Sequence, residues 1–517
     1  MRFPLALVAL CLALPFAARA ARAAAAGPVV IVVMDGLRPD SVVEADMPNL
    51  TRLARAGTFF SNHHPVYPST TEVNGTALAT GARPGHSGVV ANVEYRPELD
   101  PLFPLAMEDE WAAWAGDRTA RWIAGPTLPL ILRAQGFRTG IAGTKGVAML
   151  WDRGWENRSV DSPTVYGGAT IPGAFKDRLV ASLGPIPIVP DRRYFVNARQ
   201  DRWTTESLTK VIWAGNLPSL SVLWLSEPDY SQHGTGPGSP QSRAALKSSD
   251  DNLGLLLAAL DASGQRDRTN VMVVSDHGFS TIVQTVDVLA DISQQGIPVG
   301  GGFLQKPDPG TVVAVTLGGL VNFYVIGRDR ALTERLVRFL QTTAYAGVLF
   351  TREKNPGTFG LTDAGMEGPE GPDVVMAMRW SADVPGPGLP PGLVTNSSTS
   401  YGPRQGMHGS LSRYDMNNTL IAAGPAFRTG FRSETPSANS DVAPTVLRVL
   451  GLPMAAAMDG RVLEEALVGG AAPKVETETM QATATVGGRT WRQYLKVSRV
   501  DGRTYYLEGN AGPPPVP

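Results

Sequence analysis

Acidic residues and histidines occur together in three short segments, and this combination can bind divalent metal ions. Asp229 precedes His233 by four residues, Asp276 is followed directly by His277, and His408 lies in the glycine-rich segment GMHGS. Two residues four apart meet on one face of a helix, so Asp229 and His233 can share one ion. Carboxylate and imidazole ligands without cysteine suit a catalytic zinc site, and manganese is the alternative.

Each of these segments also has an ordinary structural interpretation. The first can be a pair on a helix surface, the second a turn at the end of a strand, and the third a simple glycine loop. All three ordinary explanations would have to hold at once to exclude a metal site. We therefore favour the metal site.

A hydroxyl group that could act as a nucleophile lies at the start of a predicted helix. Ser69 and Glu72 fit a capping box ahead of an alanine- and leucine-rich run, which places Thr70 and Thr71 in the first turn. Unpaired N–H groups and the helix dipole favour an anion at this position. A threonine here can be structural or nucleophilic, and the helix pattern alone does not decide between these roles.

Apolar runs predict the strands that must position these groups. They span 28–36, 220–229, 269–278 and 417–427, and they do not alternate, which is typical of parallel strands covered on both faces. Helical patterns at 250–264 and 331–344 complete an α/β fold with a mostly parallel central sheet. Three runs end in acids, namely Asp35, Asp229 and Asp276, and ligands bind at the carboxyl ends of such strands.

The bulk composition is that of a globular protein that is exported. The chain has 517 residues, 43% hydrophobic content and a net charge of −1, and it has no basic run that would predict a nucleic-acid-binding surface. Residues 1–26 have the pattern of a signal peptide, which predicts a periplasmic or secreted protein. The single cysteine, Cys11, lies in this leader, so the mature chain has no disulfides, thiol catalysis or cysteine–zinc site. No later run is long enough to span a membrane.

The domain organisation follows from the distribution of these patterns. We expect a catalytic domain at 27–470, with insertions at about 94–220 and 279–400 that are rich in proline and glycine and carry loops and a cap. Residues 471–517 form a separate C-terminal extension, with a β-hairpin that turns at Asp501–Gly502 and a loose tail. The sequence leaves the oligomeric state open.

The order of these segments resembles that of the alkaline phosphatase superfamily. The segments are VVMDGLRPD, TTEVNG, ATGARPGHSGVVAN, SEPDYSQHG, VSDHGFS and GMHGS, with DVAPTVLRVLGLPMAAAMDGRVL near the end. The resemblance covers roughly 28–465 and is closest to the type I phosphodiesterase/nucleotide pyrophosphatase branch. It implies a three-layer sandwich with helices on both faces of the sheet, and an enzyme that hydrolyses small phosphodiesters or nucleotide pyrophosphates.

The resemblance also implies a role for each candidate residue. Two divalent ions are expected, with zinc preferred over manganese. One ion would be held by Asp229, His233 and His408, and the other by Asp35, Asp276, His277 and the oxygen of Thr71. Thr71 is preferred to Thr70 as the nucleophile that forms a phosphothreonine. Asn92 stands at the family's interval from Thr71 and would donate to a phosphoryl oxygen.

The chain departs from the family pattern at two places that concern the substrate. Family members typically read T-F-P-N-H at the nucleophile, whereas this chain reads T-E-V-N-G from Thr71. Phosphomonoesterase and phosphonate-hydrolase relatives use a pair of basic residues, of which this chain has Lys145 but only Val147 at the second position. Lys145 is either a substrate ligand or a solvated surface lysine. Phosphomonoester or phosphonate hydrolysis, head-group transfer and a non-catalytic binding role are therefore kept as alternatives.

Overall fold

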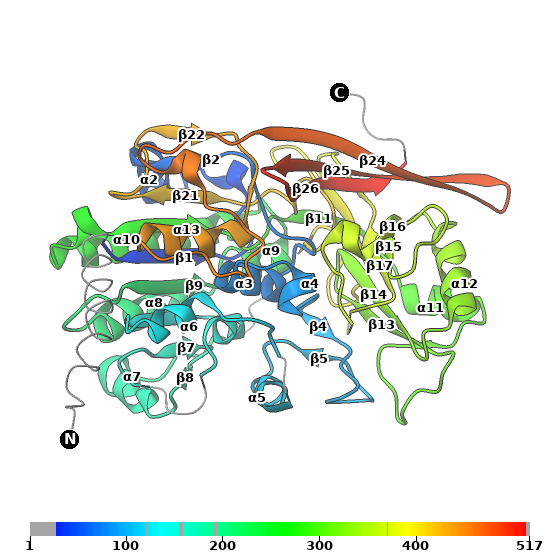
Figure 1. Ribbon diagram of the computed structural model, residues 1–517, viewed down its shortest axis with the longest axis horizontal. Helices are drawn as coiled ribbons and strands as arrows, with labels where there is room; N and C mark the ends of the chain where they lie inside the picture. Colours follow the sequence, from blue (N-terminus) through cyan, green and yellow to red (C-terminus); the bar gives the residue numbers. More distant parts are fainter. Residues whose placement is uncertain (1–26, 120–121, 155–158, 190–194, 370, 513–517) are drawn as a thin grey trace, which may run out of the picture.

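A nine-stranded sheet forms the centre of the molecule (Figure 1). The computed structural model describes residues 27–119, 122–154, 159–189, 195–369 and 371–512, and the predicted signal peptide at 1–26 lies outside them. The strands of this sheet are β1 (Val29–Met34), β2 (Thr58–Phe60), β6 (Thr139–Gly143), β7 (Thr164–Tyr166), β8 (Ala169–Ile171), β9 (Leu220–Leu225), β10 (Asn270–Val274), β21 (Leu420–Ala423) and β22 (Phe431–Ser433). Their order is β22-β2-β21-β10-β1-β9-β6-β7-β8.

The middle of this sheet is parallel, as the sequence predicts. β10, β1, β9, β6 and β7 all run in the same direction. The prediction of a parallel strand at 417–427 is wrong, because β21 pairs antiparallel with β10. All residues of β21 are buried, so its sequence has the same continuous apolar character as its parallel neighbours and does not reveal its direction.

Helices cover both faces of the central sheet and complete three layers. One face packs against α3 (Thr71–Thr80), α6 (Leu128–Ala134) and α13 (Val442–Val449). The other face packs against α2 (Pro48–Ala56), α7 (Phe175–Leu183), α8 (Ala198–Glu206) and α10 (Pro240–Ala262). Successive side chains of a strand point to opposite faces, so β1 supplies Val29, Ile31 and Val33 to the first core and Val30, Val32 and Met34 to the second.

The region predicted as the first insertion, 94–220, is partly built into this sheet. It contributes β6, β7 and β8, and β6 pairs with β9 in the parallel core. β7 and β8 are only 3 residues long each, which explains why the sequence showed no regular alternation of strands and helices here. β4 (Val93–Glu94), β5 (Leu105–Ala106) and α5 (Glu110–Thr119) come from the remainder.

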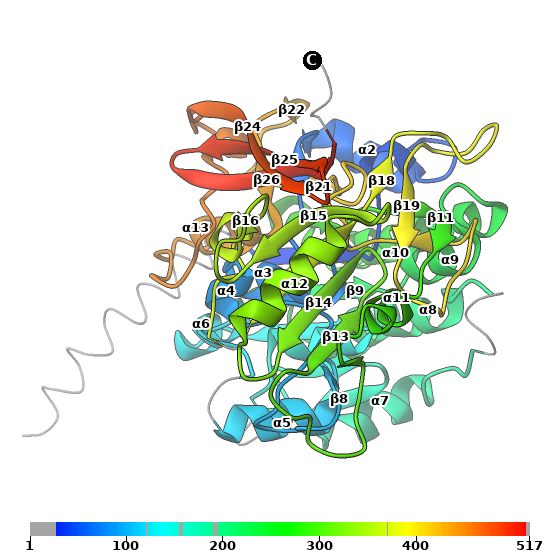
Figure 2. The same cartoon turned by 90° about the vertical axis from the view of Figure 1, so that its right-hand side faces the viewer.

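The region at 279–400 forms a second, six-stranded sheet beside the first (Figures 1 and 2). Its strands are β12 (Val299–Gly300), β13 (Val312–Thr316), β14 (Leu320–Val325), β15 (Ala346–Thr351), β16 (Phe359–Gly360) and β17 (Val374–Met378). The helices α11 (Val288–Gln294) and α12 (Arg330–Leu340) pack on it. A four-stranded sheet of β11 (Ser280–Thr285), β18 (Trp380–Ser381), β19 (Leu393–Asn396) and β20 (Gly406–Met407) leads back to the central domain.

The C-terminal residues form a three-stranded antiparallel sheet. Its strands are β24 (Val475–Val486), β25 (Arg489–Val500) and β26 (Arg503–Ala511), with Asp501–Gly502 between the last two. Leu495, Val497 and Tyr506 share a core with Val348 and Phe350 of β15, so this sheet packs on the second sheet. Within the described ranges, every helix is too short or too polar to cross a membrane.

Candidate active site

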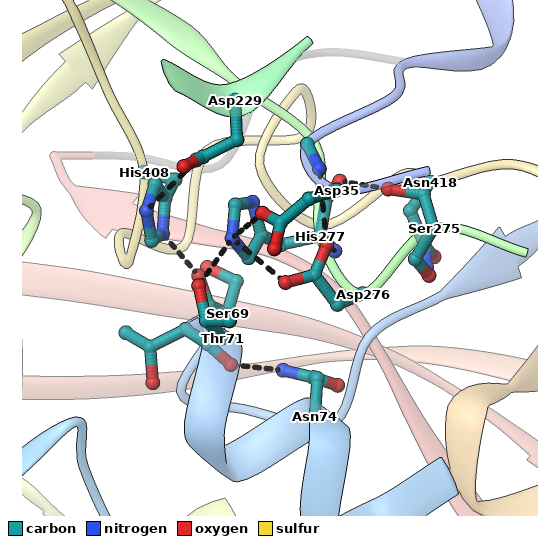
Figure 3. Close-up of polar contacts among 12 residues, drawn as sticks. Asp35, Ser69, Thr71, Asn74, Asp229, Ser275, Asp276, His277, His408 and Asn418 are labelled. Atoms are coloured by element: carbon teal, nitrogen blue, oxygen red, sulfur yellow. Dashed lines mark hydrogen bonds and ion pairs between the residues drawn. The ribbon is translucent and has the colours of Figure 1, made fainter. Parts of the chain in front are cut away.

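The predicted metal ligands meet at the carboxyl ends of β1, β9 and β10 (Figure 3). Asp35 follows β1, β9 leads into α9 (Asp229–Thr235), and Asp276 and His277 follow β10. His408 comes directly after the short strand β20. Two groups of side chains have ligand atoms that all lie within 4.8 Å of one another; they are Asp229, His233 and His408, and Asp35, Asp229 and His277. The sixth predicted ligand, Asp276, places its Oδ2 3.1 Å from the Nε2 of His277. Asp229 thus lies between the two predicted ion positions.

The three histidines are oriented for metal binding through Nε2. The Nδ1 of His233 donates to the carbonyl of Gly406 at 3.0 Å, and that of His277 donates to Gly278 at 3.0 Å. The Nδ1 of His408 donates to the carbonyl of Ser69 at 2.9 Å. A carbonyl only accepts hydrogen bonds, so a proton lies on the Nδ1 of each ring, and Nε2 is the nitrogen that is left to face an ion.

Three carboxylate oxygens in the site lack any hydrogen-bond donor within the described part of the chain. They are Oδ1 of Asp35, Oδ1 of Asp229 and Oδ2 of Asp276, and all are buried. Oδ1 of Asp229 lies 3.3 Å from Nε2 of His233, and Oδ1 of Asp35 lies 3.7 Å from Nε2 of His277. Buried acceptors that face the lone-pair side of imidazoles need a cation between them. The residues present therefore fit divalent metal ions.

Opposite shifts in pKa accompany this crowding of charges. Burial and the neighbouring Asp276 raise the pKa of Asp35 well above its ordinary value. Burial alone would raise the pKa of Asp229 also, but Lys145 and His233 hold it well below its ordinary value. Burial would lower the pKa of His277, and Asp276 outweighs this effect and raises it to about 9. The pattern is that of acids that compete for too few cations.

Lys145 lies inside the site, so the interpretation as a solvated surface lysine is wrong. Its Nζ donates to Oδ2 of Asp229 at 2.8 Å and lies 3.0 Å from Oδ2 of Asp35. It reaches this position because it follows β6, whose neighbour β9 leads to Asp229. Val147 is fully buried in the core beneath, so the second basic position of the relatives is absent here in space as well as in sequence.

Thr71 is the first residue of α3, and its hydroxyl points at the ligand groups. Its Oγ1 lies 3.2 Å from Nε2 of His277. Thr70 is the N-cap, and within the described residues its buried hydroxyl has no hydrogen-bond partner. The predicted capping box is wrong, because the hydroxyl of Ser69 donates to the carbonyl of Ser410 instead. That bond ties the start of α3 to the loop that carries His408.

Asn92 and Asn74 both bond backbone groups at the start of α3. The Oδ1 of Asn92 accepts from the amide of Glu72 at 3.1 Å, which places this side chain beside the first N–H groups of the helix. The Nδ2 of Asn74 donates to the carbonyl of Thr70 at 3.1 Å, and its Oδ1 accepts from the amide of Val66 at 2.8 Å. Asn74 therefore fixes the turn that leads into Thr71, a role that sequence reasoning missed.

Further supporting residues could not be found from the sequence. Trp224, the fifth residue of β9, donates from Nε1 to Oδ2 of Asp35 at 2.8 Å, although it occupies an ordinary strand position. Asp201 of α8 accepts from the amide of Ser226 at 2.8 Å and from that of Glu227 at 3.2 Å. Both contacts hold the segment between β9 and α9. The roles of Trp224 and Asp201 show only as contacts between segments that are distant in the chain, and such contacts leave no pattern in the sequence.

His63 and His64 form the short strand β3 (His63–His64), which lies outside the ligand groups. His63 donates from Nε2 to Oδ1 of Asn439 at 2.9 Å. Burial lowers the pKa of His63 to about 3, which is far below the value of about 6.5 for an unfolded histidine. This ring is therefore neutral in the folded protein at neutral and mildly acidic pH.

The consequence is a loss of stability in acid. Only the unfolded state takes up the proton of His63, so the free energy of unfolding falls as the pH drops below about 6.5, by up to about 1.4 kcal/mol per pH unit. The free energy of unfolding, measured with urea, should decrease between pH 7.5 and pH 5.5 in both proteins. The decrease should be smaller by about 1 kcal/mol in His63→Gln than in the wild type. Equal decreases in the two proteins would contradict this assignment.

Comparison with known proteins agrees with the class that the sheet and site define. Metal ligands at the carboxyl ends of a parallel sheet, facing a threonine at a helix start, are the arrangement expected of the alkaline phosphatase superfamily. Residues 29–338 match the type I phosphodiesterase / nucleotide pyrophosphatase family. This chain belongs to that family.

Individual relatives are distant and larger than this chain. It is 24% identical to human ectonucleotide pyrophosphatase/phosphodiesterase family member 1 over 254 residues, which are 49% of this chain and 23% of the relative. It is 24% identical to venom phosphodiesterase of Naja atra over 257 residues, which are 49% of this chain and 26% of the relative. The chain thus spans about a quarter of the length of the curated relatives it matches.

Solved structures share the fold over most of the chain. Murine ectonucleotide pyrophosphatase/phosphodiesterase 5 superposes with a TM-score of 0.59 at 18% identity, covering 85% of this chain and 100% of that one. An inactive form of the same murine protein in complex with AMP gives a TM-score of 0.57 at 17% identity, covering 83% and 96%. These matches confirm the predicted alkaline-phosphatase-like α/β fold.

Proposed function

We propose that this protein is an exported hydrolase that cleaves phosphodiester or nucleotide pyrophosphate bonds with two divalent metal ions. The observation that carries the proposal is the convergence of three imidazole Nε2 atoms and three carboxylate oxygens without donors beside the hydroxyl of Thr71. The pattern of a signal peptide at 1–26 supports export. The names of the relatives, which are phosphodiesterases and nucleotide pyrophosphatases, support the reaction.

The ligand sets are those that the family resemblance implies, and the two clusters support them in part, since Asp229 belongs to both clusters. Asp229, His233 and His408 would hold one ion, and Asp35, Asp276, His277 and the oxygen of Thr71 the other. Zinc is the preferred metal, because the ligands are imidazoles and carboxylates, and manganese is the alternative. When bound, the ions supply charge that lowers the pKa of a hydroxyl and stabilises the attacking and leaving oxygens of an in-line displacement.

Thr71 would carry the covalent step. Its hydroxyl loses a proton, its oxygen bonds to phosphorus, and the bond from phosphorus to the leaving oxygen breaks, so that the leaving group departs as an alcohol once protonated and a phosphothreonine that keeps the second ester group forms. Water then attacks the same phosphorus, the product phosphate monoester leaves, and the hydroxyl is restored. Asn92 and the first N–H groups of α3 would bind the phosphoryl oxygens during both steps.

A second candidate function, hydrolysis of phosphomonoesters or phosphonates, is favoured by one observation. Lys145 is directed into the site and bonded to two of the proposed ligands, where its charge could also meet the additional negative charge of a monoester. The absence of a second basic residue at Val147 favours the diester. Both functions use the same metals and the same nucleophile.

Metal removal provides the direct test. Dialysis against a chelator is expected to lower turnover of a chromogenic phosphodiester at least about 100-fold, and zinc or manganese should restore it. Mass spectrometry of the purified protein should find two ions per chain. The matched phosphomonoester, assayed in parallel, decides between the two candidate functions. Full activity in a protein shown to be free of metal would contradict the proposal.

A further inference from the structure

Two histidines that are assigned to different proposed ions stack on each other. The ring centroids of His277 and His408 lie 3.6 Å apart, and the ring planes are inclined by 13° (Figure 3). The two residues belong to separate loops, one after β10 and the other after β20. Because the rings are in contact, the relative position of these two loops decides where both Nε2 atoms lie.

The buried carboxylate of Asp415 joins these two loops. Its Oδ1 accepts from the hydroxyl of Ser280 at 2.6 Å, and Ser280 stands three residues after His277. Its Oδ2 accepts from the amide of Ser410 at 3.0 Å and from the hydroxyl of the same residue at 2.6 Å. Ser410 stands two residues after His408. One fully buried side chain thus bridges the segments that carry both histidines.

The backbone around Asp415 makes further contacts with the loop after β10. The carbonyl of Asp415 accepts from the amide of Gly278 at 2.9 Å, and that of Tyr414 accepts from the amide of Phe279 at 3.2 Å. A Cβ added to Gly278 would lie only 1.9 Å from the carbonyl oxygen of Tyr414, so this close approach requires a glycine. The turn that carries Asp415 therefore packs directly against the segment that follows the first histidine.

Asp415 is itself outside the two groups of candidate metal ligands. Both of its carboxylate oxygens accept hydrogen bonds from the protein, whereas the proposed ligand Asp229 has an oxygen without a donor in the described part of the chain. Hydrogen bonds to a carboxylate are stronger than those between neutral groups, so this bridge is suited to holding the loops in place.

We propose that Asp415 is a positioning residue that holds His277 and His408 together in the arrangement that binds the two ions. This inference rests on the proposed function and identifies one residue on which both ion positions depend. Groups that orient metal ligands without touching the metal set its affinity, and their loss typically weakens binding by about 10- to 100-fold.

Zinc affinity of the full chain, measured by competition with a chromophoric chelator, tests this role. Asp415→Ala should weaken zinc binding by about 30-fold, because both histidine loops lose their common partner. Asp415→Asn should stay within about threefold of the wild type, since an amide can accept from Ser410 and donate to the hydroxyl of Ser280. Equal losses in the two variants would overturn the positioning role.

Asp250→Ala is the matched control for a loss of stability. Asp250 is also a buried aspartate, and its two oxygens accept from the backbone amides of Asn49 at 3.0 Å and Leu50 at 2.8 Å. These bonds join α10 to α2, and neither helix contributes to the ligand groups. Asp250→Ala should therefore be destabilised but keep the zinc affinity of the wild type. A loss of affinity as large as that of Asp415→Ala would show that destabilisation alone explains the effect, which would overturn the proposal.

Hydrogen exchange in the metal-free protein is a second readout that needs no ion. In Asp415→Ala the amides at 277–281 and 408–412 should exchange at least about tenfold faster, while those of the C-terminal sheet keep their protection. If Asp415→Ala does not fold, Ser410→Ala replaces it, because it removes only one hydroxyl group from the bridge. Ser410→Ala should weaken zinc binding by about tenfold, and unchanged affinity in this variant would overturn the proposal.

The outcomes separate this inference from the proposed function. If the wild type binds zinc and Asp415→Ala binds it equally well, or if exchange at both loops is unchanged, the positioning role is overturned and the proposed hydrolase stays intact. If the wild type binds neither zinc nor manganese, the proposed hydrolase is contradicted and the positioning role falls with it.

Discussion

Replacing Thr71 by alanine is expected to lower phosphodiester turnover by about 10,000-fold while the protein keeps its metal. The oxygen removed is the one that lies 3.2 Å from Nε2 of His277, and the remaining ligand atoms are untouched. Alanine is accepted in the first turn of a helix, so the fold should be retained. Turnover of a chromogenic phosphodiester, metal content and thermal unfolding are to be measured on the same preparation.

Thr70→Ala is the matched control for this change. Thr70 directly precedes Thr71 and its hydroxyl is also buried. Its methyl group faces the loop at Gly409, where a Cβ added to Gly409 would lie 3.3 Å from the Thr70 methyl carbon. Thr70→Ala should therefore stay within about threefold of the wild type, which is less than 1 kcal/mol. Near-normal activity of Thr71→Ala together with an inactive Thr70→Ala would show that the proposed nucleophile is wrong by one residue.

The substitution Asp229→Asn is expected to have the second largest effect. Asp229 belongs to both ligand groups and also bonds Lys145, so an amide in its place removes a charge that both ion positions share. We expect turnover to fall about 1,000-fold, or about 4 kcal/mol, and the metal content to fall below two ions per chain. Turnover and metal analysis at a fixed, limiting zinc concentration measure both effects.

Asp329→Asn supplies the control for Asp229→Asn. Asp329 caps α12 through its side chain, and asparagine caps helices about as well, so stability, metal content and turnover should all be unchanged. If Asp229→Asn matches this control in metal content and turnover, the shared ligand is misassigned. If it loses turnover but keeps both ions, Asp229 acts on the reaction and not on metal retention.

The parts of the fold that the sequence predicted are those with strong local signals. The three parallel strands at the centre are continuous apolar runs, and each ends in an acid where the chain leaves the sheet. The direction of β21 was not predictable, because a strand buried on both faces has the same composition in either direction. The capping box failed because Ser69 found a partner in a loop 341 residues away.

The candidate site shows the same division. The Asp and His ligands stand in recognisable segments, and they come together because their strands are neighbours in the sheet. Lys145 could not be placed, because its position depends on β6 lying next to β9, and the residues around β6 show no regular alternation of strand and helix patterns.

The contact between His408 and Ser69 has a consequence for how the protein would acquire its proposed metal ions. The imidazole of His408, a ligand of one proposed ion, bonds the start of α3, 339 residues earlier in the chain. Contacts of such long range close late in folding, because the intervening chain must be ordered first. Metal uptake would then report completed folding, because a chain whose C-terminal third has not yet packed against α3 lacks the complete set of ligands. Local opening of the loop at His408 would let the ion escape long before the rest of the protein unfolds.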